Sequence, residues 1–417
     1  MKLLSTVAAV ALLGTAAHAE TLRMSWWGGE SRHVATQAAL EVCGAKYGHT
    51  IAPEFTGFDG YLEKLTTQMA GGTEADIIQV NWPWLPLFSK DGNGFLDLNS
   101  VSSTLDLSQW SADQLASTTV DGKLNGLPVS TSGRVFFFNV TTLADAGIAI
   151  PTTWDEFFAA AEALRAAKGA TYTLFNAVKE TAQLLVTLSV VQATGKDLVD
   201  PETNRVAWSA EELAAGIEFY ARLVETGAIR SMQDDAAAGN VNLFEKPDWA
   251  NGLIAGSYEW DTTYSKYADP LAEGQVLQAV PYIRPAVGTI DGVYRKPSMM
   301  FTISRNSAHP EAAAQILNCL MNEPEGIDAL GDSRGIPSSA VAAARLAEAG
   351  KVNANIAAAN AIAMAASGPN VSPFNEHPEI RGLFIDTLEE FAYGQISAAD
   401  AAEVIIEGAN DVLAQFD

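Results

Sequence analysis

The sequence predicts an α/β fold with two lobes, and three observations support this prediction. Short apolar strands alternate with amphipathic helices from Thr21 onward, as in a parallel sheet covered by helices on both faces. After Pro151 the composition changes to Ala-rich helices, and a strand and helix like those of the first region return near residue 298. The 417 residues are enough for two or three domains with ample cores.

The elements expected in the first region are strands over Thr21–Trp26, His49–Phe55 and Ile77–Val80, helices over His33–Tyr47 and Gly60–Met69, and extended segments over Lys123–Ser130 and Arg134–Asn139. Those expected afterwards are helices over Trp154–Lys168, Ala182–Gln192, Glu211–Glu225 and Pro310–Met321, strands over Leu253–Trp260, Gln278–Tyr282 and Ser298–Ser304, and a helical tail over Ser339–Phe416 that breaks around Gly368–Pro373. Thr152 or Thr153 caps the helix at Trp154, with acidic residues in its first turn.

The predicted lobe boundaries lie where the chain passes from one pattern to the other. We place crossings near residues 128–132, 297 and 338, which gives one lobe of residues 20–130 and 298–338 and a second of 131–297 and 339–417. Several crossings between two lobes make a hinge rather than a flexible tether.

The first 19 residues have the pattern of a cleavable signal peptide. Lys2 precedes a short apolar segment, and Ala17-His18-Ala19 matches an A-x-A cleavage site. The apolar segment is too short for a membrane span, and Glu20 rather than a cysteine follows the site, which disfavours a lipid anchor. We expect an exported, soluble, periplasmic protein.

Composition and charge limit the class of partner. Hydrophobic residues make up 48% and charged residues 18%, as in an ordinary globular protein. The net charge of −25 argues against nucleic acid or an anionic membrane surface as partner. It does not exclude an acidic ligand, because screening acts over about 8 Å at physiological salt and a local arginine cluster can outweigh the distant field.

Only two cysteines, Cys43 and Cys319, are present. Both lie among apolar residues of predicted helices, and we expect two buried free thiols, although an oxidising compartment also permits a disulfide. Neither the cysteines nor the five histidines show a metal-binding spacing, so we expect no metal and no cofactor.

The segment Asn81-Trp82-Pro83-Trp84 follows the apolar strand at Ile77–Val80 and is the most informative motif. Indoles on a proline-stiffened loop at the carboxyl end of a strand form an apolar platform where such sheets bind ligands. Beside such a ring an amide such as that of Asn81 suits sugar hydroxyls. The alternative is that the indoles belong to the core, and we expect one of each tryptophan pair to do so.

The first loop carries the second candidate group, with Trp26-Trp27-Gly28-Gly29-Glu30 leading to Arg32 and His33. Its glycines allow close approach of a ligand to the backbone, and the following helix begins with free amides that favour acceptor oxygens. The loop is not GxGxxG, so a dinucleotide site is poorly supported.

Further candidates lie at the crossings and at the end of a later strand. Ser130, Thr131, Ser132 and Arg134 lie at the first crossing, and their alternative role is a hinge turn. Tyr258, Trp260 and Asp261 combine aromatic rings with a carboxylate, and Arg334 adds a second candidate guanidinium beside Gly335. The arginines could instead form exposed ion pairs, which contribute little to stability.

An enzymatic function is poorly supported. Glu259 and Asp261 alternate along a strand-like segment, so they should point to opposite faces and not form a glycosidase acid pair. GxSxG is absent, and the histidines are scattered. We expect a non-enzyme, with a secreted polysaccharide-degrading enzyme as a remote alternative.

The ordered motifs of the mature chain resemble the extracellular solute-binding proteins (family 1) of carbohydrate ABC transporters, and most closely the oligogalacturonide-binding proteins. Segments with this resemblance are Met24–Gly29 with Arg32-His33, Thr66–Gly71, Asn81–Pro86, Ser89–Phe95, Gly122–Gly126 with Pro128, Arg134–Phe136, Pro151–Glu156, Asn322–Gly326, Arg334-Gly335 with Pro337, and Val371–Pro373.

The resemblance implies a type II, maltose-binding-protein-like fold with hinge crossings and an inter-lobe ligand cleft. It implies that the first loop, Asn81, Trp82, Ser130–Ser132, Tyr258, Trp260 and Val371–Phe374 line that cleft. The resemblance also implies a monomer that passes a carbohydrate to permease subunits in the inner membrane. We expect an acidic sugar such as an oligogalacturonide, because several arginines fall at the predicted cleft. A neutral or sulfonated glycoside is the alternative, since the chain departs from the oligogalacturonide pattern near Glu30-Ser31 and over Thr171–Asn251.

Overall fold

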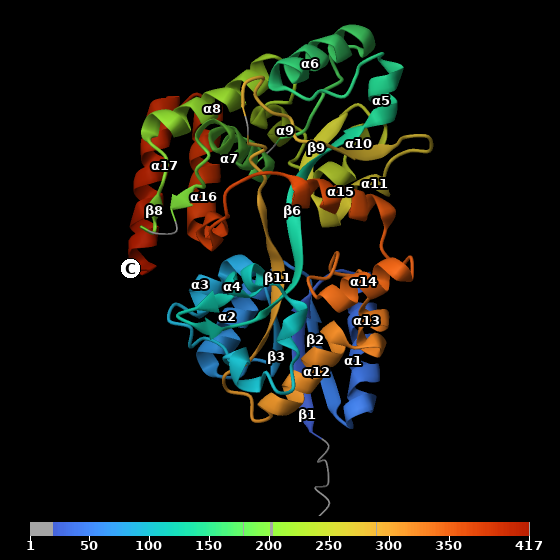
Figure 1. Ribbon diagram of the computed structural model, residues 1–417. Helices are drawn as coiled ribbons and strands as arrows, with labels where there is room; N and C mark the ends of the chain where they lie inside the picture. Colours follow the sequence, from blue (N-terminus) through green and yellow to red (C-terminus); the bar gives the residue numbers. More distant parts are fainter. Residues whose placement is uncertain (1–19, 178, 201–202, 289, 417) are drawn as a thin grey trace, which may run out of the picture.

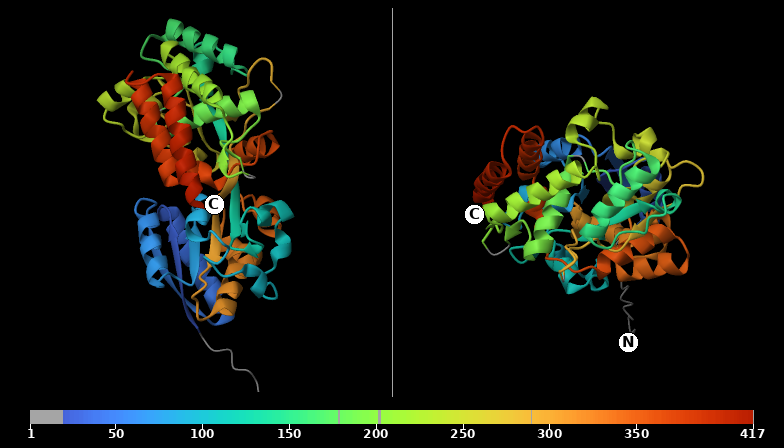
Figure 2. Two further views of the ribbon diagram at one scale, coloured as in Figure 1. Left: turned by 90° about the vertical axis from the view of Figure 1, so that its left-hand side faces the viewer. Right: turned by 90° about the horizontal axis from the view of Figure 1, so that it is seen from above.

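The chain folds into two lobes stacked one above the other, with strands passing between them at the centre (Figure 1). The computed structural model describes residues 20–177, 179–200, 203–288 and 290–416. The predicted signal peptide lies outside the described residues. The largest hydrophobic cluster of each lobe is separate from that of the other lobe, which confirms the expected two-lobed α/β architecture, and a side view shows the narrowing between the lobes (Figure 2).

The lower lobe is built on three parallel strands. β1 (Thr21–Trp27) lies between β2 (Thr50–Thr56) and β3 (Ile77–Val80) and pairs in parallel with both. Its other elements are the helices α1 (Glu30–Tyr47), α2 (Tyr61–Gly71), α3 (Leu85–Phe88), α4 (Ala112–Ala116), α12 (Pro310–Asn322), α13 (Pro324–Leu330) and α14 (Ala340–Glu348), and the short strands β4 (Thr119–Val120) and β5 (Lys123–Leu124). The predicted helices and strands of this region are confirmed within a few residues.

Two long strands join the lobes. β6 (Leu127–Asn139) runs upward from the lower lobe, and β11 (Arg295–Ile303) returns antiparallel to it (Figure 1). The expectation of two separate extended segments is wrong, because β6 is continuous through Gly133. A Cβ at Gly133 would lie 2.6 Å from the Cβ of Ala363, so the residue permits close packing rather than a turn. The expected all-parallel sheet is also corrected, since β11 and β6 make it mixed.

The upper lobe places helices on both faces of β6 and its neighbours. β9 (Gly256–Trp260) and β10 (Leu277–Val280) pair antiparallel with β6. The remaining elements are the helices α5 (Val140–Asp145), α6 (Trp154–Lys168), α7 (Glu180–Thr194), α8 (Ala210–Glu225), α9 (Met232–Ala237), α10 (Pro247–Ala250), α11 (Tyr264–Ala268), α15 (Ala354–Ala365), α16 (Pro378–Ala392) and α17 (Ala398–Leu413), and the short hairpin β7 (Val199–Asp200) with β8 (Arg205–Val206). Thr153 caps α6 in a capping box with Glu156, as predicted.

The position of the final crossing depends on which lobe α14 packs against. α14 packs its buried Ala342 and Leu346 against Ile327 of α13, which belongs to the lower lobe. α15, in contrast, packs against β6 in the upper lobe. We therefore propose that the last crossing falls between Glu348 and Ala354 rather than near residue 338, because the buried side chains of α14 pack against α13 of the lower lobe.

Cys43 and Cys319 form a disulfide, so the expectation of two free thiols is wrong. Their Cα atoms lie 5.8 Å apart although 276 positions separate them in the sequence. Both side chains are fully buried, on α1 and α12. The disulfide ties the first helix of the lower lobe to a helix that returns to this lobe after the upper lobe has been built.

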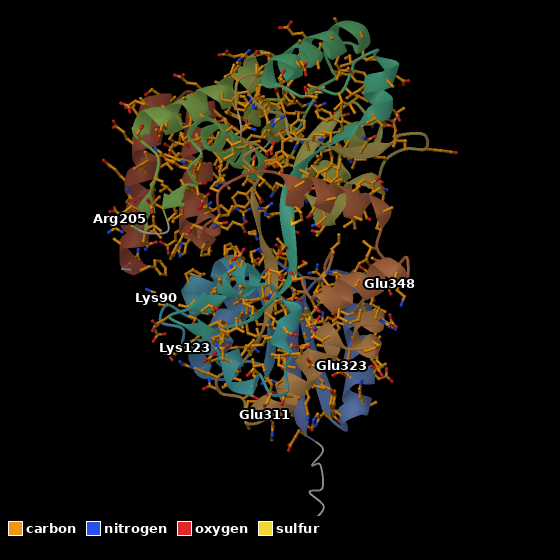
Figure 3. All side chains as sticks on the ribbon, in the orientation of Figure 1. Lys90, Lys123, Arg205, Glu311, Glu323 and Glu348 are labelled. Atoms are coloured by element: carbon orange, nitrogen blue, oxygen red, sulfur yellow. A yellow bond between two sulfur atoms is a disulfide. The ribbon has the colours of Figure 1, made fainter. Side chains whose placement is uncertain are left out.

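The lobes also touch away from the crossing strands. Lys90, which Figure 3 labels at the edge of the lower lobe, donates to the Gln415 carbonyl at 2.9 Å. The same ammonium lies 4.2 Å from the centroid of the Phe416 ring. A short helix, η6 (Pro373–Glu376), contacts η1 (Trp82–Trp84) of the lower lobe.

Candidate functional site

The loops after β1, β2 and β3 end on the edge of the lower lobe that faces the upper lobe (Figure 1). Trp27 ends β1 and Gly28 follows it, Phe58 follows β2, and Asn81 and Trp82 follow β3. Carboxyl ends of parallel strands are where open α/β sheets bind ligands. The predicted residues of the lower lobe are therefore gathered on one edge.

An aromatic cluster occupies this edge. Ring centroids of Trp27 lie 5.7 Å from Phe58, 5.2 Å from Tyr61 and 5.5 Å from Trp84. Trp27 is 6% exposed, whereas Phe58 is 50% exposed. The ring that this cluster presents to solvent is therefore Phe58, which sequence reasoning missed because a lone phenylalanine in a Gly-rich loop gives no pattern.

The other indoles of the lower lobe are largely covered. Trp82 is 4% exposed, and its Nε1 donates to the Ser117 carbonyl at 2.7 Å. Trp84 is also buried, while Asn81 beside them is half-buried. The expected open face on one indole of each pair is thus not seen in this conformation, and ligand contact by Trp27 and Trp82 stays a prediction.

Three residues of the first loop and helix have different surroundings. His33 is buried, accepts the Trp26 indole hydrogen at 3.1 Å and stacks on Phe55, so we no longer propose it as a ligand contact. Gly28 makes room for a side chain rather than a ligand, because a Cβ there would lie 2.6 Å from Cδ of Arg32. Glu30 is exposed at the start of α1.

A cavity lined by many charged side chains lies in the upper lobe. It has a volume of about 420 Å³, and we call it the upper pocket. Five basic and three acidic side chains line it: Arg134, Lys179, Lys246, Lys266 and Arg381, and Glu180, Asp235 and Glu259. Asn176, Asn242 and Phe244 add amides and a ring to the wall. This combination suits a polar ligand that carries negative charge.

Arg134 is the centre of the charge network in the upper pocket. Its guanidinium lies 2.6 Å from Glu180 and 3.3 Å from Glu259. The guanidinium of Arg381 lies 2.6 Å from the second carboxylate oxygen of Glu180. Burial acts to raise the pKa of Glu180, but Arg134 and Arg381 hold it below its usual value. Burial raises the pKa of Glu259 despite the same arginine. Arg134, predicted as a ligand contact, thus already has two carboxylate partners.

Trp260 connects the upper pocket with the crossing strands. The guanidinium of Arg134 and the ammonium of Lys296 each lie 4.8 Å from its ring centroid. Lys296, on β11, also lies 3.3 Å from Glu376 of η6, the segment that touches the lower lobe. Trp260 is partly exposed, which keeps it a candidate for stacking on a ligand.

Two predicted site residues, Tyr258 on β9 and Asp261 just after it, are buried in the upper lobe. Tyr258 is fully buried, with its ring 4.8 Å from that of Phe136. Asp261 is also fully buried, and it accepts hydrogen bonds from Asn360 and from the backbone of Thr262. Because neither side chain reaches solvent, we no longer propose them as ligand contacts.

The residues of the first crossing make bonds that fix it. Ser130 donates to the Arg334 carbonyl at 2.7 Å, Ser132 lies 3.3 Å from the Thr262 hydroxyl, and the Thr131 carbonyl accepts from Asn360 at 3.1 Å. These contacts fit the hinge role that the sequence left open. Ligand contact by Ser130, Thr131 and Ser132 stays a prediction.

Arg334 and Arg32 lie together on the lower lobe. Arg334 is 3% exposed and donates from Nε to Gln79 at 2.7 Å. Arg32 donates to the carbonyls of Ser333, at 3.1 Å, and Trp27, at 3.3 Å. Their acceptors are all neutral, which sets them apart from Arg134.

The described residues contain no group of three or more histidine, cysteine or carboxylate side chains placed to hold a metal ion. Over the same residues, no helix combines the length and apolar character that a membrane span requires.

Comparisons with known proteins agree on one family. The family model described as "Bacterial extracellular solute-binding protein" matches residues 34–326. A curated protein of Brucella abortus named "Putative binding protein" is 32% identical over 290 residues, 66% of this chain, and the chain spans about 65% of the length of that relative.

Solved structures match over nearly the whole chain. A periplasmic solute-binding protein of Pectobacterium atrosepticum is 35% identical, with a TM-score of 0.90 over 96% of this chain and 100% of the other. A periplasmic oligogalacturonide-binding protein of Yersinia enterocolitica, in complex with saturated digalacturonic acid, is 36% identical, with a TM-score of 0.88 over 95% and 99%. A cyclic maltosyl-maltose-binding protein of Arthrobacter globiformis, 19% identical over 95% of this chain and 99% of its own, shares the fold with a TM-score of 0.72. The two-lobed, maltose-binding-protein-like fold implied by the sequence motifs is confirmed.

Proposed function

Because the chain belongs to the bacterial extracellular solute-binding protein family, we propose that it is the substrate-binding component of an ABC importer for an acidic oligosaccharide. An oligogalacturonide is the first candidate ligand, since a structural relative of 36% identity was solved with digalacturonic acid. The protein would work as a periplasmic monomer after removal of its signal peptide, and it would deliver the sugar to permease subunits in the inner membrane.

The upper pocket is the observation that supports an acidic ligand. Its basic side chains outnumber its acidic ones by five to three, in a protein whose net charge is −25. A wall with excess positive charge in such a protein attracts an anion locally, because charges beyond about 8 Å are screened. Charge-assisted hydrogen bonds from arginine and lysine to a carboxylate are about twice as strong as neutral ones.

We propose that the ligand binds between the upper pocket and the aromatic edge of the lower lobe. Phe58 and Trp260 would stack on apolar sugar faces, and the pocket amides would bind hydroxyls. A ligand that touches both lobes favours the closed form, whereas a ligand that touches one lobe shifts no equilibrium. A dissociation constant of about 1 μM corresponds to about 8 kcal/mol, which a few stacked rings and charge-assisted bonds can supply.

The carboxylates of the upper pocket support a binding role rather than hydrolysis. Glu180 is held by two arginines, and Glu259 by one. A glycosidase needs one carboxyl that donates a proton and another that acts as base or nucleophile. Glu180 and Glu259 share Arg134 as a partner, so neither is free for these roles, and we propose that the protein is not an enzyme.

A neutral or sulfonated glycoside is the second candidate. The half-exposed ring of Phe58 favours it, since stacking on a sugar face does not depend on a carboxylate.

Isothermal titration calorimetry with digalacturonate, a neutral digalactoside and a sulfonated glycoside separates these proposals. We expect digalacturonate to bind at least tenfold more tightly than the neutral disaccharide, with an affinity that falls as salt rises. Equal or tighter binding of the neutral or sulfonated compound would exclude the acidic-sugar proposal. Incubation with pectin, followed by detection of reducing ends, should show no product.

A further inference from the structure

Arg32 and Arg334 are two guanidinium groups of the lower lobe that have no carboxylate partner among the described residues. Arg32 is in the first turn of α1, and Arg334 follows α13, 302 positions later. One hydrogen bond joins the two segments: Arg32 donates from Nε to the carbonyl of Ser333, the residue before Arg334. The fold has thus brought two like charges together from distant parts of the sequence.

The surroundings of Arg334 are almost entirely neutral. Its Nε donates to Gln79, its Nη1 lies 3.4 Å from the Ser333 hydroxyl, and its guanidinium lies 5.2 Å from the Phe301 ring centroid. The Nη2 atom is buried and has no hydrogen-bond partner. Among the described residues, neither Arg32 nor Arg334 makes a salt bridge, whereas Arg134, which is as buried as Arg334, makes two.

Such an arrangement costs free energy unless an anion completes it. Buried charges in proteins are normally paired, and a buried donor without an acceptor carries its full desolvation penalty. Burial lowers the pKa of Arg32 to about 10. Burial, together with the charge of Arg32, lowers the pKa of Arg334 well below its usual value. Both groups are still protonated at neutral pH, so the unfavourable charge remains.

Arg32 lies beside the aromatic edge that we propose for sugar binding. Its Nη1 donates to the carbonyl of Trp27 at 3.3 Å, and the Trp27 ring lies 5.7 Å from the exposed ring of Phe58. Arg32 is also partly exposed, so a ligand can reach it from solvent. A planar guanidinium matches a carboxylate in a bidentate geometry, which a lysine cannot provide.

We propose that Arg32, supported by Arg334, forms a carboxylate-binding subsite on the lower lobe. This inference rests on the proposed function and makes it more specific: the ligand carries at least two carboxylates, one for the upper pocket and one for this subsite. Each lobe then holds one charged end of the ligand. A dianionic sugar engages both lobes and favours closure, whereas a sugar with one carboxylate leaves one subsite empty.

Calorimetric titration of Arg32→Gln and Arg334→Gln variants with digalacturonate and with the neutral digalactoside tests the subsite. We expect Arg32→Gln to weaken digalacturonate binding about 10- to 100-fold and to leave the neutral disaccharide unchanged. Arg32→Lys should restore only part of the loss. Arg305→Gln is the matched control, because Arg305 is an exposed arginine of the same lobe that also donates to a neutral carbonyl, that of Asn93.

A second measurement keeps the subsite testable if the sugar proposal fails. Acetate alone, at constant ionic strength, should raise the melting temperature of the wild type more than chloride does, and the difference should vanish in Arg32→Gln. If the wild type ignores digalacturonate but this acetate effect holds, the sugar is wrong and the carboxylate subsite stands. If Arg32→Gln binds digalacturonate like the wild type, or responds to acetate like it, the subsite is refuted. Because Arg334 is buried, Arg334→Gln can fail to fold. The result for Arg32→Gln, at a partly exposed position, therefore decides the test.

Discussion

The arginines of the two lobes differ in the charge of their partners. In the upper lobe, Arg134 is surrounded by Glu180 and Glu259, and Glu180 is further shared with Arg381. In the lower lobe, the acceptors of Arg32 and Arg334 among the described residues are neutral, and one nitrogen of Arg334 has none there. A paired charge holds a structure together, while an unpaired one is available to a ligand. In a binding region, the partners of a basic residue therefore indicate its role better than its residue type does.

The largest expected effect comes from breaking the paired network of the upper lobe. Arg134→Met leaves the buried Glu259 without its cation, and removal of one partner of a buried pair costs about 3–5 kcal/mol. We expect this loss in the free energy of unfolding, measured by urea denaturation and circular dichroism. The double variant Arg134→Met/Glu259→Gln should recover part of it. A single variant as stable as the wild type would mean that the network does not hold the upper lobe.

The disulfide gives the second effect and concerns the lower lobe alone. Cys43 and Cys319 close a loop of 276 positions, and the loss of such a link reduces stability by about 2–4 kcal/mol. Reduction should lower the urea midpoint of the lower lobe and leave that of the upper lobe in place. The Cys43→Ala/Cys319→Ala variant should match the reduced wild type and respond no further to reductant. A wild-type midpoint that reductant leaves unmoved would contradict the link.

A smaller effect distinguishes the exposed ring of the lower edge from its buried neighbours. Phe58→Ala should weaken sugar binding about tenfold, because stacked aromatic contacts contribute about 0.5–1.5 kcal/mol beyond area burial. Its melting temperature should stay near that of the wild type, since the ring is 50% exposed. Phe55→Ala is the control, because Phe55 is 39% exposed on the same segment but packs against His33 and Trp26. Equal affinities for the two variants would remove Phe58 from the site.

The smallest effect is a pH dependence at the surface of the lower lobe. Asp328 is bound by Arg345, and Lys351 lies 3.2 Å away. Hydrogen bonds from Arg345 lower the pKa of Asp328 to about 2. A lowered carboxyl pKa stabilises the folded state above the unfolded value of about 4, and this stabilisation is lost as the pH falls toward 2. The difference in melting temperature between the wild type and Asp328→Asn should therefore disappear between pH 4 and pH 2, and a difference that persists at pH 2 would argue against the cause.

Much of the fold could be predicted because its signals are local. Strand and helix periods, and the capping box of Thr153 with Glu156, appear within a few residues of each other. Features that depend on distant partners could not be predicted. The disulfide joins residues 276 positions apart. The contact of Leu346 and Ala342 with Ile327, on which our placement of α14 rests, is likewise not visible in a local pattern. A hinge turn at the first crossing was an open alternative, yet Gly133 packs closely against Ala363 inside a continuous strand.

For the candidate site, too, local features could be predicted from the sequence and contacts between distant residues could not. Residue types such as Trp260 and Arg134 could be chosen from the sequence, but their burial and partners could not. Tyr258 and Trp260 differ by two positions, yet one lies in the core and the other is partly exposed. Lys266 and Arg381 reach the upper pocket from separate helices, and no spacing in the sequence relates them to Arg134.

The most direct test is a crystal structure of the protein with digalacturonate. We predict the sugar between the lobes, with one carboxylate in the upper pocket, the other within hydrogen-bonding distance of Arg32, and a sugar face on Phe58. A sugar bound elsewhere, or bound between the lobes with no carboxylate near either group of arginines, would contradict the account.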